Sequence, residues 1–314
     1  MKEIFIGEEI RRCREKLKIS QGELAFGICD VTTLSRLENG QQTPSRNTVK
    51  NLLARLGEPD DRFYAYVTGK EAEIEATTKN ITSLVIKYEN SIGKAKIDAK
   101  LDALAAIDDF EKLVSGSDNI SKQFIERMKV IVGHSEGDYC PREKIKLLDQ
   151  AIKLTYPNFD MKKIEEGYFS YDEVMLINQL ANEYCENKQY GEATDILRQL
   201  LKNIDRRFTK ISSGWTRKSL VQYSLARCLL LMDNIESALS CADEGKKICI
   251  EHNTYNLLPG FYIILAECHY RQGNIQQSKD LFVEAYYLGK AINQDANQII
   301  AKKSLIEYFN TKID

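Results

Sequence analysis

Apolar residues recur every three or four positions along most of this chain, which is the period of helices that bury one face. In the first sixty residues the pattern breaks into four short segments. They predict helices over residues 5–17, 20–27, 30–39 and 45–56. Ser20 with Glu23 three positions later is a capping-box pattern at the start of the second helix. Gly57 and Pro59 follow the fourth helix and end this group of helices.

The third of these helices has two different faces. Asp30 is expected to cap it, and Leu34 and Leu37 are expected to face the core. The outward positions then carry small or polar side chains, which are Thr32, Thr33, Ser35 and Arg36. Side chains of this kind suit a helix that enters a DNA groove. Residues 1–57 also hold ten Lys or Arg against seven Asp or Glu, a weak basic excess.

From about residue 60 to the end, the chain has the pattern of successive amphipathic helices with short connections. Three segments fit the tetratricopeptide pattern of a Leu-Ala pair followed, twelve positions on, by a small residue. The pairs are Leu180-Ala181, Leu225-Ala226 and Leu265-Ala266, and the small residues are Ala193, Ala238 and Ser278. The small residues are 45 and 40 positions apart, whereas regular repeats have roughly 34. The helices must therefore be extended or the loops enlarged.

Weaker signs of the same architecture flank these repeats. Residues 124–153 look like a weaker repeat, residues 81–114 like at least one helical hairpin and residues 296–309 like a terminal helix. The sequence therefore predicts an all-α protein, a helix-turn-helix domain followed by a tetratricopeptide-like α-solenoid. We expect the first domain at 1–66, a linker at 67–79 and a repeat domain for ligand binding and dimerisation at 80–314. Stacked helical pairs leave a concave surface lined by the first helix of each pair.

Composition predicts a globular protein of the cytoplasm. Of the 314 residues, 43% are hydrophobic and 29% are charged, and the net charge is close to zero. The N-terminal residues include acidic side chains where a signal peptide would be apolar, and no apolar run approaches the length of a membrane span. Eight cysteines at irregular spacings, without a C-x-x-C pair, indicate reduced core residues.

We expect neither catalysis nor a cofactor. The sequence has no phosphate-binding glycine loop, nucleophile elbow, paired-carboxylate motif or Cys/His arrangement. The three histidines are His134, His252 and His269, and they form no H-E-x-x-H pattern. No cysteine stands at zinc-ligand spacing from them, so a metal site is not expected.

The segment SQGELAFGICDVTTLSRLENGQQTPS, residues 20–45, resembles the helix-turn-helix of the Xre and phage-repressor class, which has the lambda-repressor-like fold. Its G-I-C turn is one residue shorter than the usual phage-repressor pattern. In this it is similar to the peptide-sensing regulators of Gram-positive bacteria, the Rgg, PlcR and PrgX group. These regulators also carry lengthened, degenerate repeats, so the resemblance covers essentially the whole chain. It implies a quorum-sensing transcription regulator.

The resemblance implies DNA contacts at six positions, which are Gln21, Val31, Thr32, Thr33, Arg36 and Asn39. Gln21 falls on a phosphate contact, where the helix N-terminus adds partial positive charge. Val31, Thr32 and Arg36 fall on base-reading positions, and Thr33 and Asn39 on backbone contacts. Arginine can pair bidentately with guanine, and a Thr or Val methyl can touch a thymine methyl. A solvated surface charge at Arg36 and simple packing of Val31 remain the alternatives.

Arg14 and Glu38 also match a pair in the family pattern. The resemblance implies that they form a structural salt bridge that locks the first helix to the third. They are not expected to contact DNA.

Placing the first helices on the repeat pattern points seven side chains into the concave surface. They are Asn178, Gln179, Asn182, Tyr223, Arg227, Glu267 and Arg271. Side-chain amides can satisfy both the N–H and the C=O of an extended peptide backbone, so this set suits a short peptide. The alternative is that they are ordinary solvated groove residues, because any solenoid covers its concave face with polar groups.

The sequence thus predicts a DNA-binding regulator modulated by a short signalling peptide. Its expected partners are an inverted-repeat double-stranded DNA operator, the peptide and a second copy in a homodimer. No membrane partner is expected. Two alternatives stay open, namely a constitutive or phage-type repressor whose repeats only dimerise, and a repeat scaffold that binds another protein.

Overall fold

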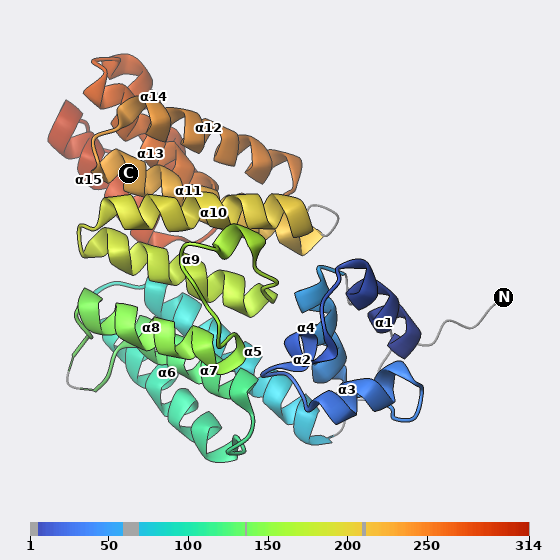
Figure 1. The fold of residues 1–314 in the computed structure, drawn as a ribbon. Helices are drawn as coiled ribbons and strands as arrows, with labels where there is room; N and C mark the ends of the chain where they lie inside the picture. Colours follow the sequence, from blue (N-terminus) through green and yellow to red (C-terminus); the bar gives the residue numbers. More distant parts are fainter. Residues whose placement is uncertain (1–5, 59–68, 136, 209–211, 314) are drawn as a thin grey trace. The chain divides into compact units, whose positions relative to one another are not determined.

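The computed structural model describes residues 6–58, 69–135, 137–208 and 212–313 (Figure 1). Within these ranges the chain forms helices and no β-strand, so the predicted all-α fold is confirmed. The first helices are α1 (Ile6–Lys16), α2 (Gln21–Ala25), α3 (Val31–Glu38) and α4 (Arg46–Leu56). They are followed by α5 (Gly69–Asn90), α6 (Gly93–Leu113), α7 (Asn119–Val132) and α8 (Pro141–Thr155). The remainder are α9 (Tyr171–Glu186), α10 (Tyr190–Arg207), α11 (Ser212–Leu231), α12 (Ile235–Glu251), α13 (Leu258–Arg271), α14 (Ile275–Ala291) and α15 (Asp295–Phe309).

The ends of the first four helices follow the capping residues of the sequence. The Ser20 hydroxyl accepts the backbone N–H of Glu23 at 3.2 Å, and the Glu23 carboxylate accepts that of Ser20 at 2.8 Å, which completes the capping box. Ser45 caps α4 by accepting the N–H of Thr48 at 3.1 Å. One expectation fails, because Asp30 stands at the N-cap of α3 but its side chain makes no capping hydrogen bond.

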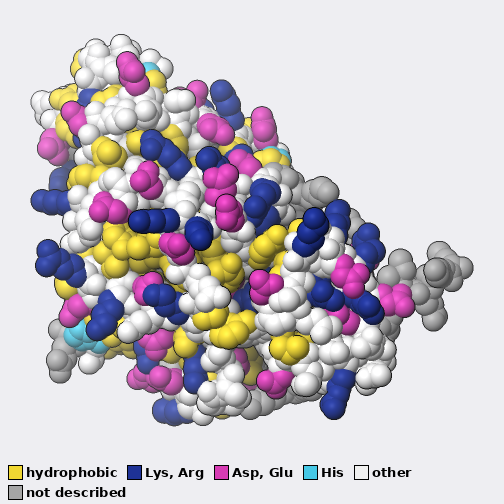
Figure 2. Space-filling view, viewed as in Figure 1, with side chains coloured by type: hydrophobic (Ala, Val, Ile, Leu, Met, Phe, Trp, Pro, Cys, Tyr) yellow, Lys and Arg dark blue, Asp and Glu magenta, His cyan; other side chains and the backbone are white. Residues whose placement is uncertain are grey.

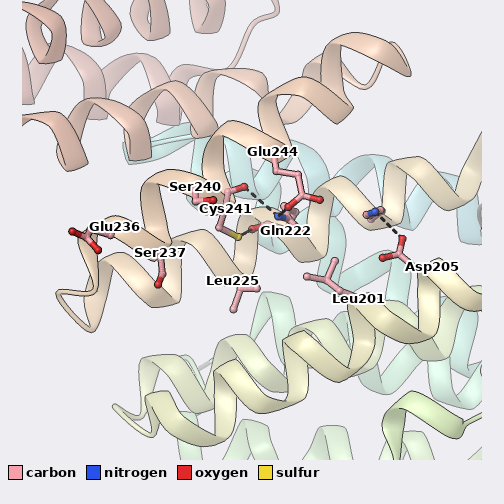
Figure 3. Close-up of a pocket in the computed structure, with 10 residues that line it drawn as sticks. Leu201, Asp205, Gln222, Leu225, Glu236, Ser237, Ser240, Cys241 and Glu244 are labelled. Carbon is pink, nitrogen blue, oxygen red and sulfur yellow. Dashed lines mark hydrogen bonds and ion pairs between the residues drawn. The ribbon is translucent and has the colours of Figure 1, made fainter.

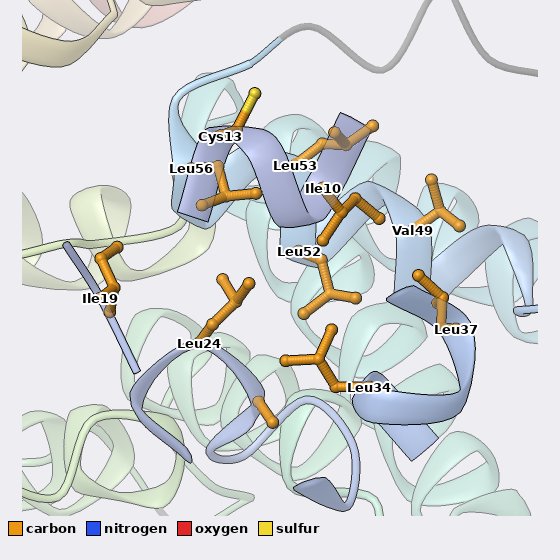
Figure 4. Packing of buried hydrophobic residues seen from close by; sticks show 11 residues of the cluster. Ile10, Cys13, Ile19, Leu24, Leu34, Leu37, Val49, Leu52, Leu53 and Leu56 are labelled. Carbon is orange, nitrogen blue, oxygen red and sulfur yellow. The ribbon is translucent and has the colours of Figure 1, made fainter. Parts of the chain in front are cut away.

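The apolar faces of α1 to α4 meet in one core (Figure 4). Leu34 and Leu37, the two inward residues predicted for the third helix, are fully buried there. The other core side chains include Ile10, Cys13, Leu24, Val49, Leu52, Leu53 and Leu56. Because each helix is too short to be stable alone, this shared core is what holds α3 in place.

The residues divide into two compact units. The first contains residues up to 85 together with 101–177, and the second contains 86–100 together with 178–314. The helix-turn-helix therefore groups with α7 and α8, and this division does not follow the predicted boundaries at 66 and 80. Residues 69–79 of the expected linker are the first turns of α5.

In the second unit, consecutive helices from α10 to α15 pack against one another and lie side by side in Figure 1. This neighbour-to-neighbour packing is that of a helical repeat array. The three predicted repeats correspond to α9 with α10, α11 with α12 and α13 with α14. Their small residues Ala193, Ala238 and Ser278 are fully buried. Ser278 donates its hydroxyl hydrogen to the carbonyl of Ala266 at 2.7 Å, which satisfies a polar group at this small-residue position.

The second repeat has glycine where the pattern usually has a larger apolar residue. Gly245 of α12 lies against the fully buried ring of Phe261 in α13. A Cβ atom placed on Gly245 would come 2.2 Å from Cζ of that ring. The absence of a side chain therefore allows α12 and α13 to approach closely.

We expect Gly245→Ala to lower the free energy of unfolding by about 1–3 kcal/mol through overpacking, despite the better helix propensity of alanine. The matched control is Gly191→Ala in α10, where a Cβ would meet nothing within 4 Å. That control should unfold at the same or a higher urea concentration than the parent protein. Circular dichroism measures the urea midpoint of unfolding for each variant. Equal midpoints for the two variants would contradict the close approach of α12 and α13.

Candidate nucleic-acid interface and ligand groove

The outer face of α3 carries the predicted base-reading residues. Thr32, Arg36 and Asn39 are exposed at positions i, i+4 and i+7, which is one side of a helix. Val31, at the first turn, is 47% exposed, which is unusual for a large apolar side chain that only packs. Thr33 is half-buried at the edge of this face. We call the surface of Val31, Thr32, Arg36 and Asn39 the α3 face.

Arg36 is the only cation of α3, and it makes no ion pair with any residue that the structure describes. Its five N–H donors are therefore available to a ligand. On the face drawn in Figure 2, basic and acidic side chains are interspersed over α1. The neighbouring charges thus pair among themselves, as Arg11 does with Glu15 at 2.9 Å.

The predicted salt bridge between Arg14 and Glu38 is confirmed. Nε of Arg14 lies 2.7 Å from one carboxylate oxygen of Glu38, and Nη2 lies 2.9 Å from the other. Such a bidentate pair fixes both distance and direction. The Glu38 side chain is 1% exposed, and its hydrogen bonds with Arg14 raise the pKa of that arginine above its ordinary value. The pair joins α1 to the end of α3.

Gln21 takes part in the same network. Its amide Nε2 donates to Glu38 Oε2 at 2.7 Å, so one of its two side-chain N–H groups is used within the protein. The second N–H remains for the phosphate contact that the sequence predicts, and the internal bond would hold the amide in position for it. The phosphate contact itself stays a prediction.

Three of the predicted groove residues lie on α9 and present amide groups. Asn178 is only 4% exposed, and its Oδ1 accepts no hydrogen bond from any described residue. Oε1 of the half-buried Gln179 also accepts no hydrogen bond from any residue that the structure describes. Buried polar atoms are nearly always hydrogen-bonded, so unsatisfied carbonyl oxygens on adjacent residues indicate acceptors for a ligand or for water. Asn182, one turn further on, is half-buried.

The charged groove residues are engaged with the neighbouring repeats. Arg227 pairs with Glu186, and Arg271 donates to Asp233 Oδ1 at 2.8 Å and to the Leu230 carbonyl at 3.2 Å. The seven predicted residues lie on α9, α11 and α13, the first helices of the three repeats, and we call this set the row. The two arginines of the row already have anionic or carbonyl partners.

The remaining two groove residues are held by aromatic neighbours. Glu267 accepts the hydroxyl hydrogen of Tyr308 at 3.1 Å, and burial raises the pKa of its carboxyl group. Tyr223 packs edge-on against Phe261, with ring centroids 5.5 Å apart, and burial raises the pKa of its hydroxyl. Both side chains are therefore suited to contact a ligand through packing and hydrogen bonds more than through an unpaired charge.

A cleft of about 530 Å³ lies elsewhere in the second unit, among α10, α11 and α12 (Figure 3). Lys218 and Leu225 line it, and they lie about 160–180° around α11 from Arg227, given the helical repeat of 3.6 residues. None of the seven predicted groove residues lines this cleft. Arg227 and the cleft are thus on opposite sides of α11.

Sequence reasoning missed one buried ion pair. Arg55 of α4 and Glu173 of α9 are 2% and 0% exposed, and Nη2 of Arg55 lies 2.8 Å from Glu173 Oε1. Arg55 interrupts the apolar residues of α4 without any motif, so no local signal marks it. The partner is 118 positions away and cannot be read from periodicity.

No helix in the described ranges combines the length and apolarity needed to pass through a bilayer. In the same ranges, no three His, Cys, Asp or Glu side chains are grouped so that they could hold a metal ion.

Residues 10–63 match the helix-turn-helix family. The search of curated protein sequences gave no significant match. Among solved structures, the chain is similar to PlcR of Bacillus thuringiensis in complex with the peptide PapR7 and DNA, with 18% identity and a TM-score of 0.60 over 95% of this chain and 98% of that one. For apo PlcR of the same organism the identity is 18% and the TM-score 0.54, over 97% and 98%. For ComR of S. thermophilus with DNA and its signalling peptide ComS, the values are 13% and 0.51, over 96% and 99%.

These comparisons confirm the helix-turn-helix domain at the N-terminus and the resemblance to the PlcR-type regulators. The chain has their fold, a small helix-turn-helix domain followed by helical repeats, over nearly its whole length.

We expect Arg14→Met to destabilise α1 to α4 by about 3–5 kcal/mol, because it leaves the carboxylate of Glu38 buried without its cation. Arg11→Met is the matched control, since it breaks an exposed pair that contributes little stability. Hydrogen exchange of the α1 to α4 amides in the full chain measures both effects. Equal exchange rates of these amides in the two variants would show that the pair of Arg14 and Glu38 does not stabilise the four helices.

Proposed function

We propose that this protein is a cytoplasmic, DNA-binding transcription regulator whose activity a short signalling peptide modulates. The observation that carries the proposal is the exposed α3 face, on which Arg36 is unpaired among described residues while Leu34 and Leu37 anchor the helix. The fold adds support, because PlcR, which is similar over 95% of this chain, was solved with both a peptide and DNA.

In this proposal α3 is the recognition helix and lies in the major groove. Arg36 pairs with a guanine edge, while Val31 and Thr32 contact thymine methyl groups or neighbouring base edges. Thr33 and Asn39 contact the DNA backbone beside them. Gln21 donates its remaining N–H to a phosphate at the N-terminus of α2.

One such domain reads few base pairs, so we propose that the protein binds an inverted repeat as a homodimer. A two-fold axis then places the two recognition helices about 34 Å apart or a multiple of this. The repeat domain supplies the dimer contacts in this proposal.

The peptide is placed along the first helices of the repeats. Asn178, Gln179 and Asn182 would hydrogen-bond its main chain, because amides offer both donors and acceptors and the carbonyl oxygens of Asn178 and Gln179 lack donors among described residues. The other four residues of the row would determine which side chains or which terminus of the peptide the protein prefers. They are Tyr223, Arg227, Glu267 and Arg271. A regulator of this kind performs no catalysis and needs no cofactor.

The DNA part of the proposal is tested with a duplex selected by the protein from a random pool. Arg36→Ala should weaken binding to this duplex by about 1–3 kcal/mol and relax the preference at one base pair. Gln21→Ala should instead weaken binding to all duplexes alike, because phosphates carry no sequence information. Fluorescence anisotropy titrations measure both, with Arg11→Ala as the exposed-arginine control. Unchanged affinity and preference in Arg36→Ala would remove α3 from the DNA-reading role.

The peptide part is tested by calorimetry with a peptide recovered from a random heptapeptide library. Asn178→Ala/Asn182→Ala should lose at least about tenfold in peptide affinity, equal to about 1.4 kcal/mol, and keep its basal DNA binding. Ser240→Ala is the control, since Ser240 lines the cleft on the other side of the repeats. Equal peptide affinity in all three proteins would exclude the α9 amides. If no peptide is recovered, a constitutive repressor with dimerising repeats replaces the proposal.

A further inference from the structure

The buried pair of Arg55 and Glu173 joins the helix-turn-helix to helices of the repeat region within the first unit. The Arg55 guanidinium does more than neutralise the carboxylate. Its Nη1 donates to the carbonyls of Leu24 and Phe26 at 3.1 and 2.6 Å, at the C-terminal end of α2. Its Nη2 also donates to the carbonyl of Thr155, at the end of α8, at 3.2 Å. Helix C-termini carry partial negative charge, so one cation binds α2, α8 and α9 together.

The carboxylate end of the pair is held from several directions. Thr155 donates its hydroxyl hydrogen to Glu173 Oε1 at 2.5 Å, and the backbone N–H of Ser170 donates to Oε2 at 2.6 Å. Thr155 in turn accepts from Nε2 of the buried Gln123 at 2.6 Å. The chain of hydrogen bonds therefore runs from α4 through α9 and α8 to α7.

Two further contacts fix the same orientation. Gly27, after α2, has a φ of +69°, and a Cβ there would come 2.5 Å from Cα of Thr155. Only glycine combines this backbone conformation with so close an approach. The Tyr168 hydroxyl donates to the carbonyl of Leu17 at 3.2 Å, and Tyr168 packs against the core of the four N-terminal helices.

A buried ion pair adds little net stability, but it strongly disfavours any arrangement that separates the two charges. Desolvation cancels most of its attraction, whereas removing one partner leaves an uncompensated buried charge, which is strongly destabilising. The helices that hold Arg55 therefore cannot slide over those that hold Glu173 without a large penalty. The α3 face stays exposed in this arrangement, so the contact does not cover the recognition helix.

We propose that Arg55 and Glu173 are positioning residues that lock the DNA-reading helices to α7, α8 and the start of α9 in one orientation. The proposal rests on the proposed function, because the lock matters only when two copies read one operator. Each recognition helix then keeps a fixed place on α7, α8 and the start of α9 of its own chain, and we expect the protein to accept a single half-site spacing.

The test replaces the ion pair by apolar residues of similar size, in the variant Arg55→Met/Glu173→Leu. Such a replacement often preserves stability while it removes the directional bonds. The matched control is Glu75→Gln in α5, which removes the ion pairs of Glu75 with Arg46 of α4 and with Lys79. A milder second variant, Tyr168→Phe, loses only the hydrogen bond to Leu17.

The first readout is the tolerance of half-site spacing in the selected duplex. Inserting one base pair between the half-sites moves them apart by about 3.4 Å and rotates them by about 34°. The parent protein and Glu75→Gln should lose about tenfold or more in affinity, whereas Arg55→Met/Glu173→Leu should lose less than about threefold. Its preference for the bases within each half-site should not change. An unchanged spacing penalty in the double variant would overturn the lock.

The second readout needs no DNA. Hydrogen exchange of the full chain should increase at residues 24–28 and 155–158 in Arg55→Met/Glu173→Leu, and to a smaller extent in Tyr168→Phe. Exchange in α10 to α14 should match the parent protein, which shows that the repeats remain folded. If the parent protein selects no duplex, the proposed function fails and exchange alone decides. Unchanged exchange at both segments overturns the lock, and an increase supports it.

Discussion

An ionised carboxylate buried in a protein needs a cation or hydrogen-bond donors beside it, and this constraint organises the N-terminal half of the molecule. Glu38 and Glu173 are both almost completely buried, and each accepts from an arginine that belongs to a different helix. The first pair ties α1 to α3 inside the helix-turn-helix. The second ties that domain to the helices that follow it. Because each arginine reaches its partner through directional bonds, the position of α3 is defined both within its domain and relative to α7 and α8.

The same principle shapes the row along the first helices of the repeats, with a different result. Arg227 and Arg271 are held by Glu186 and Asp233, so they bridge successive repeats. These pairs are partly exposed, and exposed pairs contribute little stability. They can therefore exchange partners at small cost. The amides of α9 differ, since Asn178 has an acceptor oxygen without a donor among described residues.

Much of this could be predicted from the sequence because it depends on neighbours along the chain. Local periodicity and capping predicted three features that the structure contains. They are the capping box at Ser20, the inward Leu34 and Leu37, and the three helix pairs of the repeats. The salt bridge of Arg14 with Glu38 was predictable only through resemblance to a family pattern. The expected side-chain cap at Asp30 failed, because a suitable residue at an N-cap does not guarantee the rotamer that makes the bond.

The sequence by itself determined that the chain is helical, where its first four helices begin and end, and which of their faces turn inward, since these depend on residues three to twelve positions apart. Only the tertiary structure decided which side chain each buried or half-buried charge meets. Nothing near Arg55 indicates that it is buried or that its partner is Glu173, and nothing near Arg271 indicates that Asp233 holds it. Such pairings depend on how helices distant in sequence pack, and electrostatic partners are chosen by that packing.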